Sequence, residues 1–187
     1  MILEEKQIRL KDGRTAVLKT PCIEDAERLL RYIVRSCGET EFLLRYPEEW
    51  EGVTAESEEK WILDKRNAPN ALVIACYIDG EIAGNCEIGF MGGIKTAHRA
   101  VIGITVGKDC WNLGIGSAMF REMLAAAKAN PAIEIAELEV IEGNDRAIAL
   151  YEKFGFRIVA ERPNAFRLKD GSVKKEYFMQ KELRQTH

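Results

Sequence analysis

The fold is decided by Val106-Gly107-Lys108-Asp109-Cys110-Trp111-Asn112-Leu113-Gly114-Ile115-Gly116-Ser117-Ala118. A β-branched run from Val101 to Val106 predicts a strand before this stretch, and the alanine-rich segment that continues it predicts a helix. Glycine lets the backbone approach a ligand closely, and a helix N-terminus presents unpaired N–H groups with a partial positive charge. Strand, glycine loop and helix start together predict a cradle for a phosphate group.

Length and composition limit the class of protein. A chain of 187 residues suits one domain over residues 1–187, with a folded core from about residue 7 to residue 184. Apolar residues make up 47% and charged residues 30%, which is typical of a globular protein. The net charge of −3 argues against a nucleic-acid partner.

Cysteine usage and the chain start predict the compartment. The five cysteines form no CxxC pair and the chain has two histidines, so we expect no metal site and reduced thiols. Met1 to Lys6 begins no signal peptide, and the longest apolar runs, such as Ala71 to Ile78, are too short to cross a bilayer. We therefore expect a cytoplasmic protein without a membrane partner.

Periodicity and turn chemistry predict the remaining elements. Helices are expected over 21–38, with Thr20 as the cap, and over 55–67, 114–130 and 144–155. Strands are expected in two pieces within 8–19, and over 71–78, 81–90, 100–106, 133–141, 156–160 and 174–183. In 81–90, alternation places Ile82, Cys86, Ile88 and Phe90 on one face. Strands followed by two strand–helix units predict an α/β domain with a mixed sheet.

The glycine loop alone does not identify the phosphate. A dinucleotide fingerprint requires a third glycine where Met119 stands, and a P-loop requires a glycine where Asn112 stands. Two interpretations stay open at this point: a binding loop of another kind, or a turn whose glycines serve only packing.

A second motif carries a family resemblance. The segment Asn144-Asp145-Arg146-Ala147-Ile148-Ala149-Leu150-Tyr151-Glu152-Lys153-Phe154-Gly155-Phe156 resembles the N-x-x-A-x-x-L-Y-x-x-x-G-F segment of GNAT superfamily N-acetyltransferases. Trp111 to Gly116 is similar to the coenzyme A loop of that family, Q/R-x-x-G-x-G/A, with tryptophan at its first position. Residues 39–47 and 176–179 are similar to a bacterial branch near the ribosomal-protein-alanine acetyltransferases.

The resemblance implies a fold and an activity. The implied fold is a three-layer α-β-α arrangement around a central, mostly antiparallel, splayed sheet. The implied reaction is direct transfer of the acetyl group of acetyl-CoA to a primary amine, which belongs to a small molecule or a protein N-terminus. The alternatives are an acyl-CoA-binding sensor or regulatory module without turnover, and a purely structural domain.

The resemblance also implies the binding residues. The pantetheine arm of the coenzyme is expected between the strand segments 104–106 and 138–140, and its pyrophosphate at residues 111–117. The implied coenzyme contacts are Ile104, Thr105, Val106, Trp111, Asn112, Leu113, Gly114, Ile115, Gly116, Ser117, Asn144, Ala147 and Tyr151. Tyr151 is the implied general acid for the leaving thiolate, although its helical spacing also suits a core aromatic residue.

The sequence offers several candidates for the residue that removes the proton of the amine. Glu137 and Glu139 share a strand face, where a half-buried carboxylate beside another has a raised pKa, and Glu139 lies nearer the expected splay. Glu87, His98 and a chain of water molecules are the alternatives.

Two surface features concern partners. Eight glutamates between residues 39 and 59 suit either a cationic amine acceptor or a solvated surface. The resemblance also implies that the final strands can meet a second copy, which makes a homodimer an open alternative.

Overall fold

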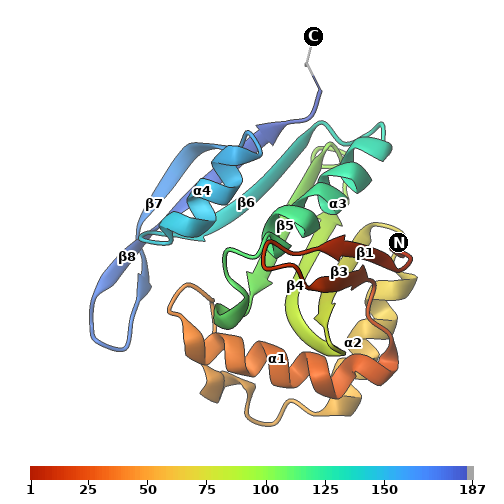
Figure 1. Ribbon diagram of the computed structural model, residues 1–187. Coiled ribbons are helices and arrows are strands. Elements are labelled where there is room, and N and C mark those ends of the chain that lie inside the picture. The colour runs from red at the N-terminus through yellow and green to blue at the C-terminus, as the bar shows by residue number, and fades with distance from the viewer. Residues whose placement is uncertain (185–187) are drawn as a thin grey trace.

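The computed structural model describes residues 1–184, so the last three residues of the expected domain lie outside the described part. An eight-stranded sheet runs through the molecule in the order β1-β2-β3-β4-β5-β6-β8-β7 (Figure 1). The strands are β1 (Lys6–Arg9), β2 (Thr15–Lys19), β3 (Ala71–Ile78), β4 (Glu81–Phe90), β5 (Arg99–Val106), β6 (Ile135–Ile141), β7 (Arg157–Arg167) and β8 (Val173–Glu182). All neighbouring strands pair antiparallel except β5 and β6, which are parallel.

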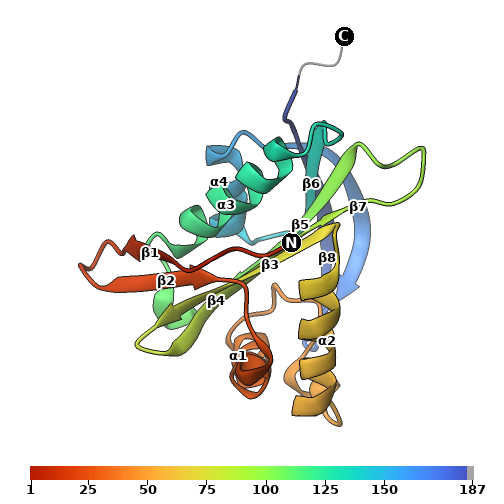
Figure 2. The ribbon, with the colours of Figure 1, turned by 90° about the vertical axis from the view of Figure 1, so that its right-hand side faces the viewer.

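Four helices cover the two faces of the sheet (Figure 2). Helices α1 (Ala26–Glu39) and α2 (Ala55–Asn67) lie on one face, and α3 (Ile115–Ala129) and α4 (Asp145–Lys153) lie on the other. This is the expected α/β arrangement of three layers around a mostly antiparallel sheet. Within residues 1–184, no helix is both long enough and apolar enough to cross a membrane.

The predicted start of the first helix is wrong. Cys22 has an extended backbone, with φ −107° and ψ 174°, and its N–H donates to the Asp25 carboxylate at 2.9 Å. A short 3-10 turn (Ile23–Asp25) follows, and α1 begins at Ala26. The chain therefore turns into the helix five residues later than Pro21 suggested, because a local side-chain hydrogen bond holds the entry extended.

The predicted face of β4 is wrong at one residue. Cys86, Ile88 and Phe90 pack in the core under α3 as expected, whereas Ile82 packs with Tyr77 in a second cluster under α1. The pairing with β3 shifts between Cys76 and Tyr77, so β4 carries one extra residue there. Such a bulge moves the side chains beyond it to the opposite face of the strand.

The strand predicted over 156–160 is in fact the much longer β7. Its pairing with β8 shifts twice, and the second shift falls between Arg162 and Phe166, where Asn164 has φ 55°. Pro163 lies within this shift, and an edge strand and a bulge both tolerate proline. The extension matters because it brings Arg162 opposite Glu176 of β8.

Candidate active site

The two parallel strands of the sheet separate along their length. β5 pairs with β6 at only three positions, from Arg99 opposite Ile135 to Val101 opposite Glu137. Beyond Val101, β5 continues to pair with β4, while β6 continues to pair with β8. The backbone edges of residues 102–106 and 138–141 that face each other are therefore open, as expected for the splay.

The glycine loop meets α3 at the open end of this splay. Asn112 and Gly114 have positive φ angles of 64° and 97°, so two residues of the loop adopt the left-handed conformation before the helix begins. Gly114 is the N-cap residue and has no side chain to cap the helix, and the first intrahelical bond runs from Ala118 N–H to the Gly114 carbonyl. The amides at the helix start thus point forward without intrahelical acceptors, as an anion site requires.

Trp111 braces the loop. Its indole N–H donates to the Val106 carbonyl at 2.7 Å, and the Arg146 guanidinium carbon lies 3.1 Å from the centre of the indole rings. Arg146 belongs to α4, so this stack ties the loop to the second motif. The tryptophan at the first loop position therefore has a structural reason, which a glutamine or arginine side chain would not supply in the same way.

The second motif forms α4 and lies against the loop. The Asn144 side chain accepts from the Ala147 N–H at 3.4 Å, so Asn144 caps the helix as predicted. Tyr151 is 6% exposed, and its ring lies 5.4 Å from that of Phe120, centre to centre. Burial raises the pKa of Tyr151 to about 12. Tyr151 therefore packs in the core and also lines the cavity described next.

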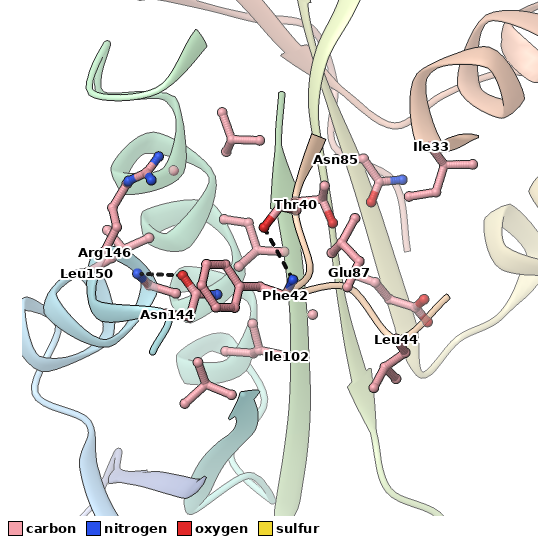
Figure 3. Close-up of a pocket in the computed structure, with 18 of the residues that line it drawn as sticks. Ile33, Thr40, Phe42, Leu44, Asn85, Glu87, Ile102, Asn144, Arg146 and Leu150 are labelled. Carbon is pink, nitrogen blue, oxygen red and sulfur yellow. Dashed lines mark hydrogen bonds between the residues drawn. The ribbon is translucent and has the colours of Figure 1, made fainter. Parts of the chain in front are cut away.

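A cavity of about 1090 Å³ joins these elements to the opposite face of the sheet. Figure 3 shows Asn144, Arg146 and Leu150 at one end, called here the α4 end, and Ile33, Asn85 and Glu87 toward the other, called the α2 end. All the predicted coenzyme residues except Leu113 line this cavity. Leu113 packs against the core instead, and its carbonyl accepts from the Lys11 N–H at 3.1 Å.

The candidate proton acceptors separate clearly in space. Glu137 lies at the closed end of the splay and is bound by Arg99, whose Nε donates to it at 2.9 Å. His98 precedes the same closed end, where its carbonyl accepts from the Ile135 N–H at 3.1 Å. Glu87 lines the cavity but forms an ion pair with Lys65 of α2. Glu139 lines the cavity with an exposed side chain.

The expected raised pKa falls on a residue that the sequence did not single out. Glu176 of β8 lines the cavity beside Glu139 and is 3% exposed. Burial raises its pKa, the Glu139 charge adds to the effect, and Arg162 opposes it. Glu137, the neighbour that the sequence offered for Glu139, forms an ion pair with Arg99, and the carboxyl group whose charge acts together with that of Glu139 is Glu176.

Three of the eight glutamates between residues 39 and 59 are bound by other parts of the chain. The Glu39 carboxylate accepts from the Lys108 N–H, that of Glu49 accepts from the Tyr46 N–H, and Glu48 forms an ion pair with Lys169. Glu58 lines the cavity, and burial raises its pKa. Of the eight glutamates, Glu58 is the one that lines the cavity.

Comparison with known proteins identifies the family. A model described as the acetyltransferase (GNAT) family matches residues 38–156, which include the splay, the glycine loop and α4. The chain belongs to the GNAT acetyltransferase family. It is an acetyltransferase, and acetyl-CoA is its acetyl donor.

Individual relatives agree with this assignment. The L-amino acid N-acetyltransferase AaaT of Escherichia coli K12 is 28% identical over 123 residues, which are 66% of this chain and 75% of that protein. A GNAT acetyltransferase structure from Streptococcus pneumoniae has a TM-score of 0.83 at 25% identity, over 90% of this chain and 99% of that chain. The yncA structure from Salmonella typhimurium, solved with acetyl-CoA, shares the fold with a TM-score of 0.77 at 14% identity, over 92% and 96% of the two chains.

The α4 end of the cavity fits a coenzyme A molecule. The uncapped start of α3 suits the pyrophosphate, since backbone amides at a helix N-terminus bind anions. A Cβ built on Gly116 would lie 3.1 Å from Leu150 Cδ2 and 3.9 Å from Ile104 Cδ1, so the glycine keeps a narrow apolar channel open between α4 and β5.

Proposed function

We propose that the protein transfers the acetyl group of acetyl-CoA directly to the primary amine of a small molecule, with amino acids as the first candidates. The observation that carries this proposal is the continuous cavity, which joins the splay to the α2 end on the other side of β5. A donor in the splay and an acceptor at the α2 end would meet beside Glu139. No acetylated enzyme intermediate is then required.

The geometry of α3 and β5 supports the donor side of the proposal. Amides at residues 115–117 would hold the pyrophosphate, and the open backbone edge of β5 would pair with the pantetheine amides. Acetyl-CoA supplies the thioester whose carbonyl the amine attacks. Tyr151 lines the cavity and is protonated at neutral pH, so its hydroxyl can donate to the departing sulfur. Burial raises its pKa to about 12, which makes this donation less favourable than from an exposed tyrosine.

The acceptor side favours an amine that carries both charge and an apolar group. Leu44 and Trp61 contribute apolar surface at the α2 end, where Glu58 contributes a carboxyl group. Phe42 lines the cavity beside the start of α4, and Glu139 lines it from β6. The Arg45 guanidinium also lines the cavity and could bind an acceptor carboxylate. This combination supports an amino acid with an apolar side chain, as does the 28% identical relative named for L-amino acids.

A thiol-release assay with a panel of amines tests the proposal. The panel contains apolar and polar amino acids, a polyamine, an aminoglycoside and a peptide with a free N-terminal alanine. We expect release of coenzyme A to be fastest with the apolar amino acids. Activity on the peptide alone would transfer the function to protein N-termini.

Calorimetry with coenzyme A completes the test. We expect binding of coenzyme A together with amine-dependent turnover. Binding with no turnover on any amine would favour the sensor alternative, and no binding at all would contradict both interpretations.

A further inference from the structure

We propose that Glu139 and Glu176 act as one proton-accepting pair, in which Glu176 is a positioning residue that strengthens Glu139 as the base toward the acceptor amine. The inference rests on the proposed function and adds a residue to it. Glu176 lies in the segment 176–179 that carries part of the family resemblance, but the resemblance assigns it no role.

The sheet register places the two carboxyl groups together. Glu176 of β8 pairs with Ile141 of β6, two residues after Glu139, so both glutamates lie on the same face of the sheet. Leu138 and Val140 occupy the opposite face and pack in the core. The side chains of Glu139 and Glu176 both line the cavity wall, and the Glu139 charge acts on Glu176.

Glu176 is buried in a way that its fold role alone does not require. The residue is 3% exposed, and its Oε2 atom has no hydrogen-bond donor aligned with it. Arg162 of β7 contacts this atom at 2.9 Å as an ion pair, and its guanidinium carbon lies 5.0 Å from the Phe178 ring centre. The burial of this carboxyl group carries a desolvation cost that the Arg162 ion pair offsets in part, and perturbed carboxyl groups of this kind gather at functional sites.

The charged groups that face Glu176 determine its behaviour with pH. Glu139 faces it from β6 and Arg162 faces it from β7. Burial raises the pKa of Glu176, the Glu139 charge raises it further, and Arg162 lowers it. The pair consequently loses its last proton at a higher pH than an isolated glutamate would, and above that pH it carries two negative charges.

Because Glu176 carries a second negative charge beside it, the exposed Glu139 is a stronger proton acceptor than an isolated glutamate. The acceptor arrives as an ammonium ion, whose N–H bond breaks while the electron pair stays on nitrogen. A carboxylate oxygen of Glu139 forms the new O–H bond, and Glu176 accepts a hydrogen bond from it. The neutral amine then attacks the thioester carbonyl, and the C–S bond breaks as the sulfur takes the proton of Tyr151. The amide nitrogen gives up its second proton, which restores the Tyr151 hydroxyl, and Glu139 returns its proton to solvent through its exposed side.

The test is the pH profile of kcat/KM in variants with opposite expected shifts. Glu176→Gln removes one ionisation but keeps the size of the side chain, so the acid limb should move to lower pH and the plateau should fall about tenfold. Arg162→Gln removes the charge that lowers the pKa of Glu176, so the acid limb should move to higher pH. Glu161→Gln is the matched control, because Glu161 is exposed on β7 and pairs with Lys175 on β8.

Carboxyl-carbon NMR gives a readout that does not depend on turnover. In the wild-type protein, Glu139 and Glu176 should titrate as a coupled pair with two steps. Glu176→Gln should abolish the upper step, and Arg162→Gln should raise it. Independent single-step titrations, or an acid limb that Glu176→Gln leaves in place, would overturn the pair.

Failure of the pair is distinguishable from failure of the proposed function. An active wild-type enzyme with an unmoved acid limb removes Glu176 from the reaction and leaves the proposed function standing. A wild-type protein that releases no thiol with any amine overturns the proposed function, and the catalytic role of the pair with it.

Discussion

The narrow channel beside Gly116 gives the sharpest prediction about the donor site. Gly116→Val adds a branched side chain whose Cβ would lie 3.1 Å from Leu150 Cδ2 and 3.9 Å from Val106 Cγ2. The Leu150 methyl is the end of a flexible side chain and can move by a few tenths of an ångström, so the fold should survive. The added methyl groups would fill the space assigned to the pantetheine arm.

The magnitude follows from the contacts that the coenzyme would lose. Displacement of the arm would break at least two charge-assisted hydrogen bonds at the start of α3, each contributing about 1.5 kcal/mol. The total of about 3 kcal/mol corresponds to a roughly 100-fold rise in the Kd for coenzyme A. Overpacking against Leu150 should cost about 1 kcal/mol of folding stability, which lowers Tm by roughly 2–4 °C.

Calorimetry and thermal unfolding measure the two effects separately. Gly89→Val is the matched control, since a Cβ built on Gly89 has no described atom within 4 Å. The control should bind coenzyme A like the wild type. A folded Gly116→Val protein whose Kd stays within about threefold of the wild-type value would refute the assignment of the channel.

Three further predictions concern other parts of the molecule. Tyr151→Phe should lower kcat at least tenfold while the Kd for coenzyme A changes less than twofold. An unchanged kcat in the thiol-release assay would show that the Tyr151 hydroxyl takes no part in the reaction. Asp25 is fully buried: burial raises its pKa, but hydrogen bonds from Cys22 and Tyr77 and the Arg28 charge lower it below the usual value. Its stabilisation should therefore be complete above about pH 4 and disappear as pH falls through the lowered pKa. In urea titrations, Asp25→Asn should lower the free energy of unfolding by about 3 kcal/mol at pH 7 and by much less at pH 2. An equal loss at the two pH values would contradict this account. Ile158 is 47% exposed on the edge strand β7, where a second copy could pair. Light scattering should therefore report a homodimer for the wild type and a monomer for Ile158→Asp. A monomeric wild-type protein would contradict this prediction.

The sequence predicted the elements that local pattern determines. The helix at 55–67, the strands at 71–78 and 81–90, and the glycine loop before α3 all lie where periodicity and turn residues indicated. The splay was also expected, but only through the family resemblance. In these segments the hydrophobic period and the turn glycines indicate the same structure, and tertiary packing favours that structure as well.

Features that depend on nonlocal pairing could not be predicted. Glu176 became a site residue because β8 lies between β6 and β7, an order that no local pattern encodes. Glu137 was considered as a base, yet the parallel register with β5 places it beside Arg99. Ile82 faced the wrong cluster in the prediction because one extra residue in β4 reverses the alternation.

Single-turnover mass spectrometry with isotope-labelled acetyl-CoA tests the central claim most directly. The enzyme is mixed with labelled acetyl-CoA and with the best amine from the panel, and the masses of the protein and of the amine are followed together. Direct transfer in the splay predicts that the label moves to the amine nitrogen at the rate of thiol release, with no acetylated protein at any time. Label that accumulates on the protein before the amine, or thiol release without an acetylated amine, would contradict the account.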